Sequence, residues 1–300
     1  MTEMSKTVRE SIGEKIFYHA ILLLLIASCI VVLYPLLHVV SVSFSNPYAV
    51  MANEVGLLPK GLTPEGYRRV FLNSDIWNSY LNTIAYTVVG TVINLCLTSM
   101  AAYSLSRNDF YGRRFWTFYF SLTMFFGGGL IPTYLLVRKL HLIDTFWVMV
   151  LLGAVSAWNM IIMRTFFSSN VPLSLQEAAI IDGANDIRIF VSVVLPLSAP
   201  ILAVMTLFYG VGHWNAFFSA LIYLNSRSRY PLQIVLREIL LQNQLNAKMA
   251  EGLSSGAEQE FIGESIRYAS IVVATVPILM VYPFLQKYFV KGILIGAIKG

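Results

Sequence analysis

Charged residues are scarce in this sequence, and their absence is concentrated in long stretches. Only 12% of the 300 residues are charged, 57% are hydrophobic and the mean hydropathy is +0.67, whereas a soluble domain is about 25% charged. Asp, Glu, Lys and Arg are missing from six windows, namely 16–53, 76–106, 115–137, 145–163, 189–226 and 268–286. About 20 helical residues cross the hydrocarbon core of a bilayer. The sequence therefore excludes a soluble globular domain and predicts an all-α membrane protein with six transmembrane helices.

The chain also lacks the patterns that carry chemistry. It has no Gly-x-x-x-x-Gly-Lys-Ser/Thr loop for ATP phosphates, no His/Glu metal pattern and no nucleophile elbow. We therefore expect no enzyme: no catalytic residue, no metal and no cofactor bound by this chain. The net charge of +5 is spread over the edges of the apolar windows, which argues against a nucleic-acid partner. Cys29 and Cys96 both fall in apolar windows and are predicted to be inert, buried thiols.

The windows define the expected domain organisation. Residues 1–16 form an N-terminal segment, 17–290 a six-helix membrane domain and 291–300 a short basic tail. The third window carries three consecutive glycines, 127–129, which remove side chains and weaken a helix. We interpret them as a site of close helix packing rather than a hinge.

Polar side chains inside the windows are candidates for a translocation path. The second window contains Asn82 and Asn94, and the fifth contains Tyr209, His213, Trp214 and Asn215. Amides are costly in lipid, so they are expected to face other helices or a water-filled path. Hydrogen bonds between helices, core packing and an interfacial aromatic belt are the alternative interpretations.

The polar segment 172–190, between the fourth and fifth windows, has the pattern of a short docking helix. Ser174 and Glu177 have the spacing of a capping box at a helix start. Ala178 and Ala179 would allow close approach to another surface, and Gly183 stands where a glycine ends a helix. A helix-turn-helix linker without a partner is the alternative.

A family resemblance rests on this segment. Glu177-Ala178-Ala179, Asp182-Gly183-Ala184 and Leu195-Pro196 resemble the EAA signature of permease subunits of binding-protein-dependent ABC importers. GGGLIPTYLLV and VGHWNAFFSALIYLN are similar to the lipo-oligosaccharide and aldouronate subgroup, relatives of the maltose permease subunits. The resemblance implies the fold of type I importer permeases and a multi-pass protein of the bacterial cytoplasmic membrane, with segment 172–190 as a cytoplasmic coupling helix in a groove of the ATPase.

The resemblance also implies partners and a mechanism. The expected partners are a second homologous permease subunit, two cytoplasmic ATPase subunits that hold ATP and Mg, an extracytoplasmic sugar-binding protein, and membrane lipids. ATP binding and hydrolysis would drive import of an oligosaccharide by alternating access. Uronic-acid-containing sugars are one option, with which Arg227 and Arg229 are compatible.

Two other classes of function stay open at this point. A self-sufficient secondary sugar transporter more often carries charged residues or inverted repeats in its spans, and the charge-free windows argue against ion coupling. A membrane-bound enzyme would need carboxylates or histidines grouped near one interface.

Overall fold

The computed structural model describes residues 11–250 and 257–297, and within these ranges it contains helices and turns but no β-strand. Residues 1–10 and 298–300, which belong to the two predicted terminal segments, lie outside the described residues. The helices are α1 (Ile12–Ser43), α2 (Pro47–Met51), α3 (Glu65–Leu72), α4 (Ser74–Ser106), α5 (Arg113–Phe125), α6 (Leu130–Lys139), α7 (Phe146–Leu151), α8 (Ala157–Asn170), α9 (Leu173–Ile181), α10 (Asp186–Ile189), α11 (Leu195–Leu197), α12 (Ala199–Trp214), α13 (Phe218–Tyr223), α14 (Leu232–Ala250) and α15 (Ala257–Ala297). The all-α prediction is confirmed.

The chain divides into two units, and the smaller one comprises the described residues up to Val70 together with Gln242–Val272. In it, the loop after α1 folds back on the end of that helix through backbone bonds, from Asn46 to Lys60 O (2.9 Å) and from Thr63 to Phe44 O (2.9 Å). Ser43 Oγ and Tyr67 Oη lie 2.8 Å apart. These bonds satisfy polar groups at the point where the apolar helix ends.

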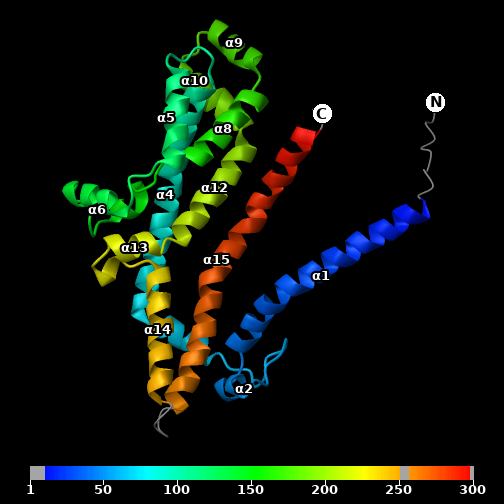
Figure 1. Ribbon diagram of the computed structural model, residues 1–300, viewed down its shortest axis with the longest axis vertical. Coiled ribbons are helices and arrows are strands. Elements are labelled where there is room, and N and C mark those ends of the chain that lie inside the picture. The colour runs from blue at the N-terminus through cyan, green and yellow to red at the C-terminus, as the bar shows by residue number, and fades with distance from the viewer. Residues whose placement is uncertain (1–10, 251–256, 298–300) are drawn as a thin grey trace. The chain divides into compact units, whose positions relative to one another are not determined.

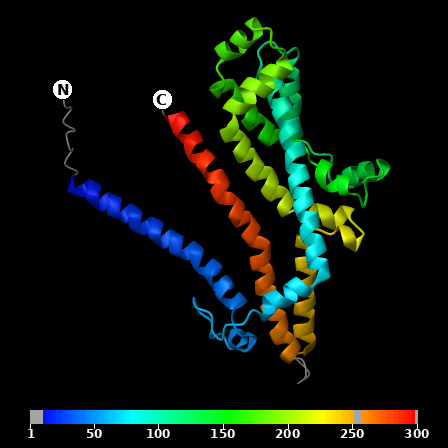
Figure 2. The ribbon, with the colours of Figure 1, turned by 180° about the vertical axis from the view of Figure 1, so that it is seen from behind.

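The larger unit, residues 71–241 with the part of α15 from Val273, is organised around α4. The α4 helix contacts α7, α8 and α12, and the views in Figures 1 and 2 show α8 and α12 beside it. Its buried stripe is largely small or polar at spacings of three and four, as in Ser79, Thr83, Gly90 and Asn94. Apolar side chains such as Val88 face outward instead. Polar inside and apolar outside is the arrangement expected of a helix that faces lipid.

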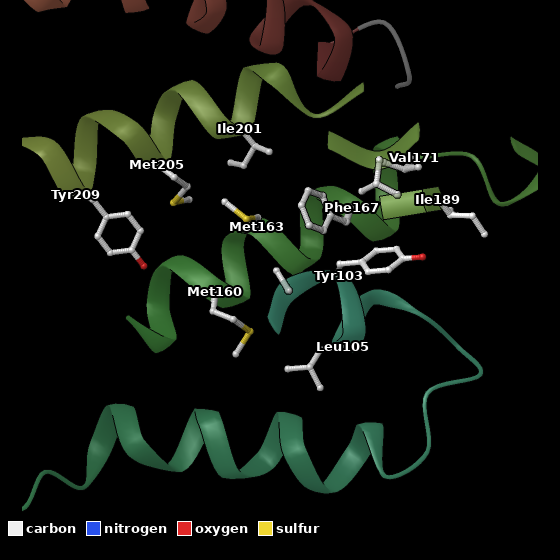
Figure 3. Packing of buried hydrophobic residues seen from close by; sticks show 12 residues of the cluster. Tyr103, Leu105, Met160, Met163, Phe167, Val171, Ile189, Ile201, Met205 and Tyr209 are labelled. Carbon is white, nitrogen blue, oxygen red and sulfur yellow. The ribbon is translucent and has the colours of Figure 1, made fainter. Parts of the chain in front are cut away.

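One apolar cluster, shown in Figure 3, packs between α4, α8 and α12. Met160, Met163 and Phe167 from α8 lie at its centre and are almost completely buried. They pack against the end of α4 on one side and against α12 on the other. Burying side chains of this size contributes about 1.5–3 kcal/mol each, so the cluster fixes α8 against both neighbours.

Three of the predicted spans are broken, which corrects the expectation of continuous helices in those windows. The third divides into α5 and α6, bent by 114°, and the fifth is bent by 84° before α12. The fourth divides into α7 and α8 around Gly153, whose φ is +74°. In the described residues, three helices are long and apolar enough to cross a membrane, or up to five if each bent pair is one span. The sequence predicts six, and the difference lies in the fourth window.

The glycines of the third window mark its bend and not a packing site. A Cβ built at Gly127 or Gly128 would meet nothing within 4 Å, so within the described part of the chain no neighbouring helix requires a glycine here. Gly129, with φ of +80°, starts α6. The run of glycines therefore acts through backbone freedom.

The break in the fifth window lies at Ser198, between α11, which contains Pro196, and α12, whose first turn contains Pro200. A π-helical turn over Phe190–Val194 precedes it, with the N–H of Leu195 bonded to Phe190 O. Proline has no N–H, and its ring pushes on the carbonyl four residues earlier, which the wider π turn relieves.

The two cysteines, in contrast to the predicted burial, are exposed free thiols on α1 and α4.

Candidate coupling segment and membrane cavity

The helix α9, which carries Glu177-Ala178-Ala179, begins two residues earlier than the proposed capping box requires. Pro172 is its N-cap, with no side-chain cap bond. Ser174 consequently lies inside the first turn and does not cap. The fixed φ of proline suits a helix start, which corrects the capping-box prediction.

The end of α9 has the geometry predicted for Gly183. Its φ is +77°, and its N–H donates to Ile180 O (2.9 Å), while the N–H of Ala184 donates to Ala179 O (2.9 Å). These two bonds form a Schellman motif, in which a glycine in left-handed backbone satisfies the last carbonyls of a helix. Gly183 therefore sets the turn between α9 and α10.

The signature residues of this segment divide between two faces. Ala179 and Ala184 pack against the apolar cluster around Met163, so their small size serves the chain's own core. A second group is exposed and comprises Glu177, Ala178, Asp182 and Gly183. Leu195 is half-buried and Pro196 exposed on the short helix α11.

The exposed face of α9 and α10 also presents large apolar side chains. Ile181 is 86% exposed and Ile187 is 74% exposed. They lie among exposed carboxylates, including Glu177 and Asp186, which excludes a position in the hydrocarbon core. Exposed apolar side chains rimmed by charge are typical of a protein interaction site.

Arg107, directly after α4, holds this segment to the membrane helices. Its Nη1 donates to Gln176 Oε1 of α9 (3.5 Å) and lies 3.5 Å from Asp186 Oδ1 of α10. Its guanidinium also forms a two-point bond with Asp109. The side chain of Arg107 is only 15% exposed and lines a cavity of about 370 Å³ together with Glu177 and Gln176.

The pairing between Arg107 and Asp109 shifts both side chains in the direction that strengthens it. The hydrogen bond to Asp109 raises the pKa of Arg107, and the same bond lowers the pKa of Asp109. Both groups therefore stay charged near neutral pH.

Three of the path candidates line one cavity between the helices. Asn94, Tyr209 and His213 border a space of about 200 Å³ together with Gly153 and apolar side chains of α7. Asn94 Nδ2 lies 3.0 Å from His213 Nε2, and Tyr209 Oη lies 2.7 Å from Thr98 Oγ1. Asn94 Oδ1 is buried and has no hydrogen-bond partner in the part of the chain that the structure describes. Asn94 therefore keeps one acceptor that the described part of the chain does not satisfy.

The other three path candidates do not line this cavity. Asn82 Nδ2 donates to the carbonyls of Ser228 (2.8 Å) and Tyr230 (3.2 Å). Trp214 Nε1 donates to Ala274 O of α15 (3.0 Å), and Asn215 Oδ1 accepts from Gln233 (3.4 Å). Their observed bonds join segments of the fold.

Sequence reasoning missed Arg107 and Thr98, which complete these two sites. Arg107 is the first cation after the second window, and its partners are 69 and 79 residues away in sequence. The position of Arg107 at the end of a predicted span could have marked it as a candidate, but the sequence does not show which distant residues it contacts. Among the described residues, no group of three or more His, Cys, Asp or Glu side chains could hold a metal ion.

Comparison with known proteins identifies the family. The family described as "Binding-protein-dependent transport system inner membrane component" matches residues 94–295. The polygalacturonan/rhamnogalacturonan transport system permease protein YtcP of Bacillus subtilis is 41% identical over 92% of this chain and 96% of its own length. Protein LplC of the same organism is 40% identical over 90% of both chains.

A solved structure agrees with the sequence relatives. A chain of a bacterial ABC transporter involved in the import of the acidic polysaccharide alginate superposes with a TM-score of 0.85 at 36% identity, covering 94% of this chain and all of that one. The present chain belongs to the family of inner-membrane permease components of binding-protein-dependent ABC importers. It is a membrane protein, and the resemblance drawn from residues 177–196 and the glycine-rich third window is confirmed at the level of the family.

Proposed function

We propose that this chain is the transmembrane subunit of an ATP-driven importer that moves an oligosaccharide containing uronic acids into the cytoplasm. The relatives that support the substrate are the polygalacturonan/rhamnogalacturonan permease and the importer of the acidic polysaccharide alginate. Both similarities extend over more than nine-tenths of the chain. ATP and Mg would be held by separate ATPase subunits, and a second permease subunit and an extracytoplasmic binding protein would complete the assembly.

The observation that carries the proposal is the exposed face of α9 and α10. Ile181 and Ile187 are exposed and lie near exposed carboxylates in sequence. Figure 1 shows α9 and α10 at the end of the helix bundle where α4 terminates. An apolar helix face of this kind fits a groove on a partner protein. We assign that groove to a cytoplasmic ATPase subunit, which places residues 172–190 in the cytoplasm.

Coupling would pass from this joint to α4 through Arg107. When ATP closes the ATPase pair, α9 and α10 move with the grooves, and Arg107 contacts both helices. The permease pair then opens toward the binding protein, and hydrolysis reverses the motion. Such alternating access requires two arrangements of packed helices with different affinities for the ATPase states.

The cavity at Asn94 and His213 supports the passage of a sugar. Amide, imidazole and phenol groups form hydrogen bonds with hydroxyls, and Asn94, His213 and Tyr209 supply these groups to the cavity. Arg227 and Arg229, considered from sequence as contacts for acidic sugars, are engaged elsewhere. Arg227 pairs with Asp75 (2.8 Å) and Arg229 with Asp144 (3.3 Å).

A detergent pull-down from the native membrane tests the proposal. Co-purification of an ATPase and a second permease subunit is expected, with ATPase activity raised by a uronic-acid oligosaccharide and its binding protein. A neutral oligosaccharide of equal length is the control. Recovery of the chain alone, still competent for sugar transport in liposomes, would favour the secondary transporter instead.

A further inference from the structure

A third cavity lies at the start of α5, next to the cavity of about 370 Å³ at the coupling segment, with which it shares Asn108 and Arg113, and separate from the cavity at Asn94. It measures about 820 Å³, and its lining residues are Asn108, Phe110, Gly112, Arg113, Arg114, Thr117, Phe118, Ser121 and Arg164. Three of the nine are arginines and none is acidic. The cavity is therefore strongly cationic.

Two of these arginines are held close together by one oxygen. Arg113 Nε and Arg164 Nε each donate to the carbonyl of Leu105, both at 3.0 Å. The two guanidinium groups carry like charges and repel each other. In the part of the chain that the structure describes, no salt bridge joins Arg113, Arg114 or Arg164 to a carboxylate. An anion in the cavity would relieve this repulsion.

The surroundings of the cavity determine which anion fits. From the cavity, α5 continues as a helix whose exposed side chains are almost all apolar or aromatic, including Phe118 at 65% exposed and Phe125 at 80%. Trp116 and Tyr119 are exposed near its start, as is typical of a membrane–water interface. A cationic head site next to an apolar helix matches an amphiphile with an anionic head and acyl chains.

We propose that this cavity binds the headgroup phosphate of an anionic phospholipid, with Arg113, Arg114 and Arg164 as ligands and the acyl chains along α5. Guanidinium groups bind phosphate oxygens through paired, charge-assisted hydrogen bonds. Basic pockets between membrane helices bind lipid headgroups for this reason. The proposal goes beyond transport and requires neither a particular sugar nor an ATPase partner.

Lipid titration of the full-length chain in detergent, followed by native mass spectrometry, tests the proposal. Phosphatidylglycerol and phosphatidylcholine with identical acyl chains are the two probes. We expect phosphatidylglycerol to bind on the order of a hundredfold more tightly, because each of the three arginines contributes a factor of about five toward an anionic lipid. Equal binding of the two lipids would overturn the proposal.

Two matched variants distinguish lipid binding in this cavity from general attraction of anionic lipid to the positive charge of the protein. Arg114→Gln removes a cavity arginine that makes none of the bonds to Leu105 O, so it preserves the fold. It should weaken phosphatidylglycerol binding about fivefold. Arg138→Gln, at an exposed arginine of α6 outside the cavity, should change it little. Equal losses in the two variants would show diffuse charge attraction and overturn the site.

Inorganic phosphate distinguishes the two sources of the anion. If millimolar phosphate displaces phosphatidylglycerol and binds equally well without lipid, the cavity is a site for free phosphate and the lipid proposal fails. Phosphatidylglycerol retained at the same phosphate concentration supports the lipid as the ligand.

Discussion

Asn94 and His213, 119 residues apart in sequence, lie within 3.0 Å of each other where α4 crosses α12. The amide of Asn94 and the imidazole of His213 are within hydrogen-bonding distance through Nδ2 and Nε2. Gly90, one turn before Asn94, makes room for this ring, since a Cβ there would lie 2.4 Å from His213 Nε2. The crossing and the polar pair therefore depend on the same small residue.

Gly90→Ala should displace the His213 imidazole and break its bond to Asn94. Overpacking of this kind costs about 1–3 kcal/mol, and we expect sugar-stimulated ATPase activity of the assembled complex to fall severalfold while membrane insertion persists. Gly210→Ala, on the same α12 helix but outside this cavity, is the control, because its Cβ would come no closer than 3.7 Å to Thr91 Oγ1. Identical thermal stability and stimulation in the two variants would contradict the steric explanation.

Substitutions at Gly183 should rank by their tolerance of left-handed backbone. Asn adopts this conformation readily and Ala costs about 1 kcal/mol more, whereas proline cannot reach φ of +77° and also loses the N–H bonded to Ile180 O. Uptake and ATPase co-purification should therefore decrease from Asn to Ala to Pro, with chain levels in the membrane unchanged. Full uptake by Gly183→Pro would rule out the assignment of this turn to coupling.

Arg107→Gln should loosen α9 and α10 from α4. The variant loses the ion pairs with Asp109 and Asp186. Both carboxylates are exposed, so we expect a stability loss of only about 1 kcal/mol but a clear fall in transport per ATP hydrolysed. Arg68→Gln, which breaks an exposed pair with Glu65, is the control. A variant with unimpaired transport per ATP would remove Arg107 from the coupling path.

Asp144 should make the loop before α7 sensitive to acid. Burial by itself raises the pKa of Asp144, but hydrogen bonds from the hydroxyl and N–H of Ser226 and from the N–H of Asn225, with the charge of Arg229, outweigh it and lower the pKa below its ordinary 3.8. The stabilisation is complete above pH 3.8 and is lost as pH falls through the lower folded-state pKa.

The stability of Asp144→Asn, compared with that of the natural chain at several pH values, tests this prediction. The variant should be less stable than the natural chain at neutral pH, and the difference should disappear in strong acid. Hydrogen exchange at the amides of Asn225 and Ser226, compared at pH 7 and below pH 3, would detect it locally. A stability difference that stays constant across this range would contradict the electrostatic origin.

The sequence predicted some of these features because their causes are local. Absence of charge located the α4 span, and a glycine after the EAA residues marked the turn at Gly183. Charge patterns show which residues lipid tolerates, but they do not report whether a helix continues, so the breaks at Gly129, Gly153 and Ser198 were not predicted.

The contacts between distant segments could not be predicted at all. The bond between Asn94 and His213 requires the crossing of α4 and α12, and the position of Trp214 against Ala274 requires the placement of α15. Polar and aromatic residues in one window therefore look alike in sequence, although only some of them border the cavity.

The length of α4 has a mechanical consequence. Its 33 residues extend for about 50 Å, which exceeds the roughly 30 Å hydrocarbon core. Near its start, Asn82 and Tyr86 hold the carbonyls of residues 228–230, and at its end Arg107 holds α9 and α10. The continuous helix α4 therefore connects the loop of residues 228–230 to the coupling segment. A movement of one of these two segments is expected to move the other through α4.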